Sequence, residues 1–175
     1  MARAAGESMQ WPEREEAFKV FIGPRLDRAY GLARHLVGDR DAEDACQEAL
    51  LTAWSAWPRL RDHARFEAWF DRILVNTCME LLRRRARRPQ TTLSEDSSIV
   101  DRDAASGSAE QDAMARALGR LSPEHRATVV LRFWADLPTD GIAERLGVPP
   151  GTVRSRLHYA LDALRADLGR DLAND

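Results

Sequence analysis

The sequence predicts an all-α protein with two small helical domains joined by a flexible acidic linker. Apolar residues recur at intervals of three and four along most of the chain, which is the period of an amphipathic helix. Glycine and proline divide this pattern into segments of helical length. The segment 89–110 is rich in Ser, Thr, Asp and Ala and lacks the helical period, which is typical of a linker. Little in the composition favours strands, so we expect no sheet.

The chain starts with a predicted flexible leader, 1–12, and a first helical region over about 13–37. Gly23-Pro24 interrupts this region and Gly38-Asp39 closes it, because proline and glycine both disfavour a continuing helix.

A long helix is predicted over about 41–57, ending at Pro58. Small residues share one stripe of this helix, and polar residues lie on its other faces. A charged helix face is solvated in most cases, so the pattern alone does not establish a binding surface. The stripe contains Ala42, Ala45, Ala49, Ala53 and Trp57, whereas Asp44, Gln47, Glu48 and Leu51 lie elsewhere.

The next helix is predicted over about 65–87, before Pro89, with an aromatic face and a basic end. The aromatic residues are more typical of a core than of a platform for stacked bases. The run Arg83 to Arg88 is different, because clustered guanidinium groups repel one another and a polyanion relieves that repulsion. The aromatic residues are Phe66, Trp69 and Phe70.

Composition excludes several classes of function. The net charge of −2 hides a segregated pattern, since the arginine run is followed by a mostly acidic stretch at 94–112. Cys46 and Cys78 are far apart and lack histidines at ligand spacing, so we expect core cysteines and neither a metal site nor a cofactor. There is no apolar run of ~20 residues and no signal peptide, which predicts a cytoplasmic protein without membrane insertion. No enzyme motif is recognisable.

The C-terminal part predicts a helix over about 111–121 and another that starts at Ser122-Pro123 and runs to about Trp134. Two further helices meet at Gly147, where a left-handed residue typically ends a helix. Pro149 and Pro150 suit the start of the next helix. This is the pattern of a helix-turn-helix, although a glycine turn between amphipathic helices is equally typical of packing alone.

The last helix separates an apolar stripe from a polar face. Arg154, Ser155, His158 and Tyr159 lie off the stripe, and arginine can bond guanine through two parallel hydrogen bonds. The free amides at its N-terminus, around Thr152, favour a phosphate. The stripe itself contains Val153, Leu157, Ala160, Leu161, Leu164 and Leu168.

The sequence of the two helices that meet at Gly147 resembles region 4 of bacterial sigma factors. The resemblance implies that Thr152, Arg154, Ser155, Arg156, His158 and Tyr159 bind the minus-35 promoter element. Gly141 and Pro149 depart from the pattern, where an acidic helix former and a capping serine are usual. Each departure costs about 1 kcal/mol of helix stability. The matching residues are Ile142, Ala143, Leu146, Gly147, Val148, Gly151, Thr152, Val153, Arg154, Ser155, Arg156 and Leu157.

The helix at 41–57 resembles sigma region 2.2 through Asp41 to Asp44, Gln47-Glu48 and Ala53-Trp54. In that family this helix docks on the β′ coiled coil of RNA polymerase. The resemblance therefore implies a polymerase contact at Asp44, Gln47 and Glu48.

The following helix resembles sigma regions 2.3 and 2.4 through Trp69, Arg72-Ile73 and Val75-Asn76-Thr77. There the helix and its preceding loop open the minus-10 element and hold a flipped base, which short polar side chains read through its Watson-Crick edge. The residues implied for minus-10 DNA are Arg61, Asp62, His63, Asn76, Arg83, Arg84 and Arg85.

Both resemblances occur in the expected order and together cover about 17–168, so the chain resembles a group IV, or extracytoplasmic-function (ECF), sigma factor. The expected domains are region 2 over 13–88 and region 4 over 111–170, with no region 1.1, region 3 or appended domain. Expected partners are core RNA polymerase, through its β′ coiled coil and β flap, promoter DNA and an anti-sigma factor, the free protein being a monomer. The alternative is a stand-alone helix-turn-helix regulator, which leaves the helix at 41–57 unexplained.

Overall fold

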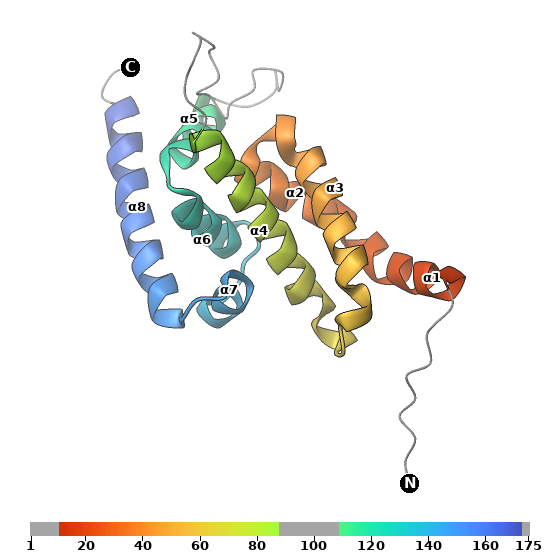
Figure 1. Cartoon of the computed structure of the whole chain (residues 1–175). Helices are drawn as coiled ribbons and strands as arrows, with labels where there is room; N and C mark the ends of the chain where they lie inside the picture. Colours follow the sequence, from red (N-terminus) through yellow and green to blue (C-terminus); the bar gives the residue numbers. More distant parts are fainter. Residues whose placement is uncertain (1–10, 88–108, 173–175) are drawn as a thin grey trace.

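The computed structural model describes residues 11–87 and 109–172, and within these ranges every regular element is helical (Figure 1). We refer to 11–87 as the N-terminal half and to 109–172 as the C-terminal half. The helices of the N-terminal half are α1 (Trp11–Ile22), η1 (Gly23–Arg25), α2 (Leu26–Val37), α3 (Asp39–Ala56), η2 (Trp57–Arg59), η3 (His63–Arg65) and α4 (Phe66–Arg87).

The C-terminal half contains four helices: α5 (Ala109–Arg120), α6 (Pro123–Phe133), α7 (Thr139–Leu146) and α8 (Pro150–Leu172). Helix α5 begins two residues before the predicted helix start at 111, and the rest of the linker lies outside the described residues. The other predicted helix ends agree with the observed ones to within about two residues, which is the usual uncertainty of a helix end.

Local sequence signals explain where the helices start and stop. Gly38, between α2 and α3, has φ 88°, a value that glycine adopts at little cost. Pro58 coincides with the change from α3 to the short helix η2. Ser122 caps α6, because its hydroxyl accepts a hydrogen bond from the amide of His125 at 3.3 Å. Pro123 then occupies the first turn of α6, where its missing amide is not needed.

The alanine stripe of α3 is buried as predicted, and it lets α3 lie close to α2 and α4. The large side chains of this half meet around Phe66, whose ring lies 5.5 Å from that of Trp57 and 6.0 Å from that of Phe70. Both Phe66 and Phe70 are buried, so the interpretation of these aromatic residues as core is correct, whereas Trp69 is only half-buried.

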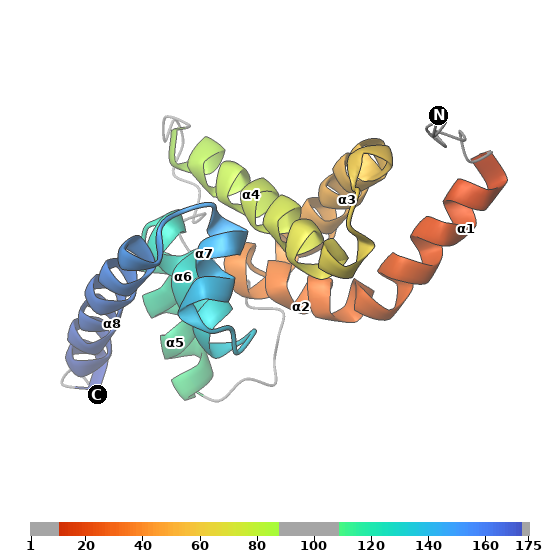
Figure 2. The ribbon, with the colours of Figure 1, turned by 90° about the horizontal axis from the view of Figure 1, so that it is seen from below.

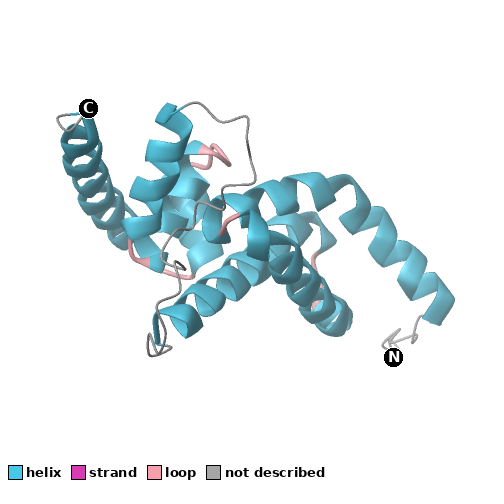
Figure 3. Cartoon of the chain, turned by 90° about the horizontal axis from the view of Figure 1, so that it is seen from above, coloured by secondary structure: helices cyan, strands magenta, loops and turns pink. Residues whose placement is uncertain are grey.

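The two halves lie against each other. Helix α4 lies between α3 on one side and α6 and α7 on the other, and α2 contacts α6 (Figure 2). One continuous cluster of buried apolar residues includes Leu74 of α4, Val130 of α6 and Ile142 of α7. Viewed from the opposite side, α8 forms the outer edge of the C-terminal half (Figure 3). The relative arrangement of the two domains, which the sequence leaves open, is therefore a packed one.

Candidate nucleic-acid interface

The turn between α7 and α8 has the geometry of a helix-turn-helix. Gly147 adopts a left-handed conformation with φ 65° and ψ 35°, and the amide of Val148 donates back to the carbonyl of Ala143 at 3.1 Å. The carbonyl of Pro149 accepts the amides of Thr152 and Val153 at 2.9 and 3.3 Å, so α8 starts at once. The predicted turn is confirmed at each of these positions.

The predicted reading face of α8 is open to solvent. Arg154, Ser155, His158 and Tyr159 are exposed, and the Tyr159 side chain retains 63% of its accessible surface. The Ser155 hydroxyl donates to the carbonyl of Thr152 at 3.0 Å, and Thr152 itself is half-buried in the first turn. A helix that projects an arginine and small polar side chains from its first turns has the shape that enters a major groove.

Arg156 differs from the other residues predicted to bind DNA on α8, because it is half-buried on the side that faces α6. Partial burial raises the pKa of the Glu124 carboxyl on α6, but hydrogen bonds from Arg83 and the nearby charges of Arg83 and Arg156 outweigh it. The Glu124 pKa therefore lies below its ordinary value, and the carboxylate stays charged at neutral pH. The charge of Arg156 therefore lies close enough to Glu124 to help lower the pKa of that carboxyl.

Helix α3 presents the predicted polymerase residues on one exposed surface. Asp44, Gln47 and Glu48 are all exposed, and the Gln47 amide donates to Glu43 at 3.2 Å. Leu51 lies three and four residues beyond Glu48 and Gln47 and is 69% exposed. The sequence placed Leu51 off the buried stripe but gave it no role. An exposed leucine beside carboxylates can anchor a helical partner.

The loop before α4 holds three of the residues predicted to capture a base. The Asp62 carboxylate caps η3 by accepting the amide of Ala64 at 3.0 Å. The His63 ring stacks on Trp57 with centroids 4.8 Å apart, and Arg61 is exposed. Asn76 lies ten residues beyond Phe66 on α4, about 15 Å along the helix axis. The structure thus groups the loop residues but not Asn76 with them.

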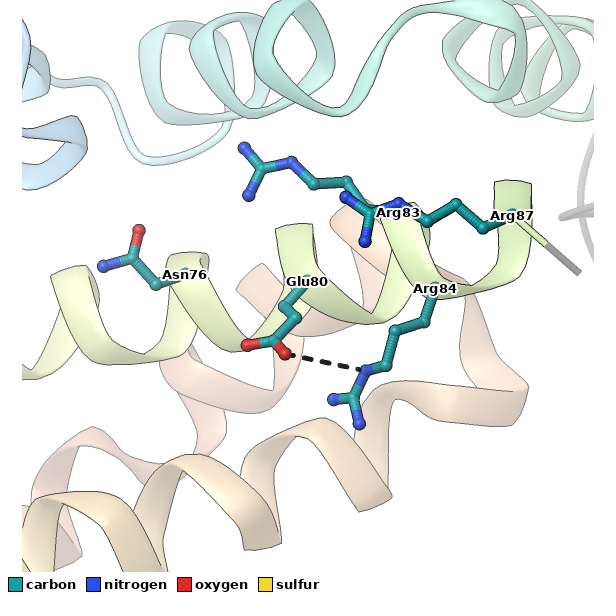
Figure 4. Close-up of a pocket in the computed structure, with 5 residues that line it drawn as sticks. All are labelled: Asn76, Glu80, Arg83, Arg84 and Arg87. Atoms are coloured by element: carbon teal, nitrogen blue, oxygen red, sulfur yellow. Dashed lines mark ion pairs between the residues drawn. The ribbon is translucent and has the colours of Figure 1, made fainter.

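Three arginines at the end of α4 are paired with acidic side chains, and Figure 4 shows one of these pairs, between Arg84 and Glu80. Arg84 lies 3.5 Å from Glu48 on α3 and 4.0 Å from Glu80, and Arg85 forms an ion pair with Asp41. Arg83 donates to Glu124 of α6, with its Nη2 at 2.5 Å. The self-repulsion that the sequence suggested is therefore partly relieved inside the chain. In Figure 4, Arg83, Arg84 and Arg87 line a polar pocket along α4 together with Asn76 and Glu80.

The cysteines lie on neighbouring helices, Cys78 buried and Cys46 half-buried. Burial raises the pKa of Cys46 to about 11 and that of Cys78 to about 12, so both thiols are protonated at neutral pH. Within 11–87 and 109–172, no group of three or more His, Cys, Asp or Glu residues could hold a metal ion. None of the helices in these ranges combines the length and the hydropathy that a membrane-spanning segment needs.

Together, the helix-turn-helix, its exposed reading face and the basic end of α4 define a helical DNA-binding protein. Comparison with known proteins identifies its family. Residues 21–88 match the family model for sigma-70 region 2, and residues 117–166 match that for sigma-70 region 4. The chain belongs to the sigma-70 family of RNA polymerase sigma factors, in its ECF group.

Its curated relatives are similar over most of their length. The RNA polymerase sigma-E factor of Streptomyces coelicolor is 36% identical over 157 residues, covering 89% of this chain and 88% of that protein. The ECF sigma factor SigL of Mycobacterium tuberculosis is 38% identical over 142 residues, covering 78% and 80%.

Two solved structures share the fold of both halves. One is RpoE from Bartonella quintana, solved in complex with the anti-sigma factor NepR. It has a TM-score of 0.71 at 25% identity and covers 88% of this chain and 98% of that one. The other is CnrH, solved in complex with the cytosolic domain of CnrY. Its TM-score is 0.64 at 25% identity, with 90% of each chain covered.

Proposed function

We propose that this sigma factor recognises promoters through two separate sets of residues, one on each half. On α8, the exposed side chains of Arg154, Ser155, His158 and Tyr159 read minus-35 base edges, and Thr152 holds a phosphate at the helix N-terminus. The observation that carries this assignment is that these side chains lie together on the exposed face of a recognition helix. Arg156 contributes less to reading, because it faces Glu124.

The N-terminal half binds both polymerase and minus-10 DNA. Asp44, Gln47 and Glu48 contact the β′ coiled coil, with Leu51 as an apolar anchor on the same surface. The C-terminal half docks on the β flap.

The predicted minus-10 residues divide between two kinds of DNA contact. Arg83, Arg84 and Arg85 neutralise phosphates, whereas the η3 loop supplies Arg61, Asp62 and His63 for the flipped base. Asn76 binds the adjacent strand from its separate position on α4.

The sigma factor itself provides binding and strand separation, and the chemistry of RNA synthesis belongs to the polymerase, so the protein is not an enzyme. It acts in the cytoplasm, where the polymerase is. An anti-sigma factor is a further partner. The sigma factor RpoE, which has the same fold, was solved in complex with the anti-sigma factor NepR, which supports the same kind of partner here.

Run-off transcription tests this function. Purified core polymerase is loaded with the chain and supplied with a fragmented genomic library, and the transcripts are sequenced. The expected result is a set of transcripts that share two upstream motifs. The double variant Asp44→Arg/Glu48→Arg should lose these transcripts and no longer be retained on immobilised polymerase, while still binding DNA through α8. A variant that keeps full transcription would refute the polymerase assignment. DNA binding without any promoter-dependent transcript would support the stand-alone regulator instead.

A further inference from the structure

A carboxylate lies within the basic face of α4. Glu80 lines the same pocket as Asn76 and the arginines at the end of the helix, and Figure 4 shows it between them along α4. Its side chain retains 66% of its accessible surface, so it takes no part in the packing of the helix. Glu80 is the acidic member of a set of side chains that are otherwise neutral or positively charged.

The ion pair between Glu80 and Arg84 does not account for this carboxylate. Nε of Arg84 lies 4.0 Å from Oε1 of Glu80, which is too far for a hydrogen bond. Nη2 of Arg84 lies closer to Glu48 of α3, at 3.5 Å. Exposed pairs one turn apart on a helix contribute little to stability. The Glu80 carboxylate therefore remains available to accept hydrogen bonds from another molecule.

A carboxylate is unfavourable on a surface that binds only phosphates. Arg83 and Arg84 attract the DNA backbone, which a negative charge beside them repels. A base, in contrast, can donate a hydrogen bond to a carboxylate through its exocyclic amine. Glu80 lies four residues beyond Asn76, about 6 Å along the helix axis, whereas successive bases of one strand are about 3.4 Å apart. Glu80 can therefore reach a base within about two steps of the one that Asn76 contacts.

The chemistry of a carboxylate favours one base over the other three. In the major groove, guanine presents two acceptors, and thymine presents an acceptor and a methyl group. Adenine presents the N6 amine next to the N7 acceptor, whereas cytosine presents its N4 amine with no acceptor beside it. An ionised carboxylate has only acceptors. It therefore repels guanine and thymine and binds cytosine better than adenine.

We propose that Glu80 is a specificity-determining residue that selects cytosine at one position of the minus-10 element. This inference rests on the proposed function, because it requires α4 to lie on minus-10 DNA. Asn76 and Glu80 read bases, and the arginines of the same face bind phosphates. The repulsion between Glu80 and the DNA backbone lowers the affinity for incorrect sites, where no base compensates for it.

Selection from a randomised promoter tests the proposal. Core polymerase loaded with the full chain is incubated with the promoter found by run-off transcription, in which the downstream motif has been randomised, and the retained DNA is sequenced. Glu80→Gln and Glu80→Ala are compared with wild type. Glu16→Gln on α1 is the matched control, because it removes the same charge from an exposed carboxylate that lies 3.6 Å from Lys19. Circular dichroism verifies the helix content of each variant.

We expect wild type and Glu16→Gln to enrich cytosine at one position of the downstream motif. Glu80→Ala should reduce this preference at least about fivefold, the lower range for a hydrogen-bonded base contact. Glu80→Gln should shift the preference to adenine, because an amide can bond N6 and N7 together. Both Glu80 variants should also retain more of the unselected library, since a negative charge is removed.

Unchanged base preferences in both Glu80 variants would overturn the proposal and would leave Glu80 as an ion-pair partner of Arg84. An equal loss of the cytosine preference in Glu16→Gln would overturn it as well, because the effect would then follow from net charge. If wild type enriches no motif, the proposed function fails together with this inference. If wild type enriches a motif that both Glu80 variants reproduce, only the role of Glu80 fails.

Discussion

The two halves of this sigma factor differ in how each fills its core. In the N-terminal half, other aromatic rings surround Phe66, and the alanine stripe of α3 allows this helix to pack closely against its neighbours. The separate core of the C-terminal half consists of Ala117, Leu121, Val129, Ala160 and Leu164. The other buried apolar residues of that half, including Ile142 and Val153, belong to the cluster shared with the N-terminal half. The reading domain therefore depends on its neighbour for part of its burial.

Helix α7 shows this dependence most clearly. It is only eight residues long, it has no side-chain cap at its N-terminus, and it carries Gly141 inside. Isolated helices of this length are unstable in water, so packing must hold α7 in place. From the sequence, Gly141 and Pro149 each lower the helix stability of this reading domain. In the structure, α7 of this domain packs against α4 of the same chain.

The largest expected effect comes from removing a buried carboxylate between the two halves. Asp71 of α4 accepts hydrogen bonds from Arg28 of α2 and from Arg145 of α7, both at 2.8 Å. Asp71→Ala leaves two guanidinium groups without their acceptor, one of them buried, and should lower the free energy of unfolding by about 3 to 5 kcal/mol. Urea denaturation followed by circular dichroism measures this. Asp162→Ala removes an exposed pair with Arg165 and should cost about 0.5 kcal/mol or less. Equal costs for the two variants would mean that Asp71 does not join the halves.

On the C-terminal half, Arg154→Ala should weaken binding to the promoter found by run-off transcription by about 1 to 3 kcal/mol and relax specificity at one upstream position. The reason is that an exposed arginine on a recognition helix can make two parallel hydrogen bonds to guanine. Arg165→Ala on the same helix is the control, because Arg165 is an exposed arginine outside the predicted reading face that pairs with Asp162. Competition binding against single-base variants of the site measures both the loss of binding free energy and the change in specificity. Unchanged sequence preference in Arg154→Ala would show that the reading face is misassigned.

Removing arginines from the N-terminal half should change DNA binding in a different way. Arg84→Ala with Arg85→Ala removes phosphate contacts and should weaken binding to all sequences alike, reducing the salt slope of log K by about 2. Fluorescence anisotropy over a series of salt concentrations measures the slope. A loss confined to particular sequences would place these arginines on base edges instead.

The smallest effect is expected at Gly141. A methyl group there would meet Pro138 and Arg145 at 3.5 and 3.6 Å, which are ordinary contacts. Gly141→Ala should therefore stabilise α7 by about 0.5 to 1 kcal/mol. Gly147→Ala, at φ 65°, should instead destabilise it by about 1 kcal/mol or more, because alanine resists the left-handed conformation. Thermal denaturation compares the two, and a loss of stability in Gly141→Ala would indicate an unseen clash.

The sequence predicts the individual helices well, because their ends depend on local chemistry. Gly38, Pro58, Ser122 and Gly147 each stop or start a helix through their own backbone preferences or a cap. The exposed residues of α3 and α8 are also predictable, since the helical period separates them from the buried stripe.

The contacts between the halves are not predictable in this way. Asp71 and Arg145 are 74 residues apart, and each alone resembles an ordinary solvent-exposed charge. Gly31 resembles a tolerated glycine within a helix until Trp134 is seen against it. The same limit applies to Arg156, whose sequence position suggests base contact although Glu124 is its neighbour. Long-range pairs of this kind require the three-dimensional structure.

Amide hydrogen exchange of α7 in the intact chain tests most directly whether the reading domain depends on packing against the N-terminal half. Wild type is compared with Gly31→Ala, whose methyl group would lie 2.6 Å from Cζ2 of Trp134 and so open the interface. The amides of α3 are an internal reference, because α3 lies away from the interface (Figure 2). We expect that opening the interface strongly reduces protection of the amides of Thr139–Leu146, while protection of Asp39–Ala56 is unchanged. Equal protection of α7 in both proteins would contradict the claim that the reading domain is held by the N-terminal half.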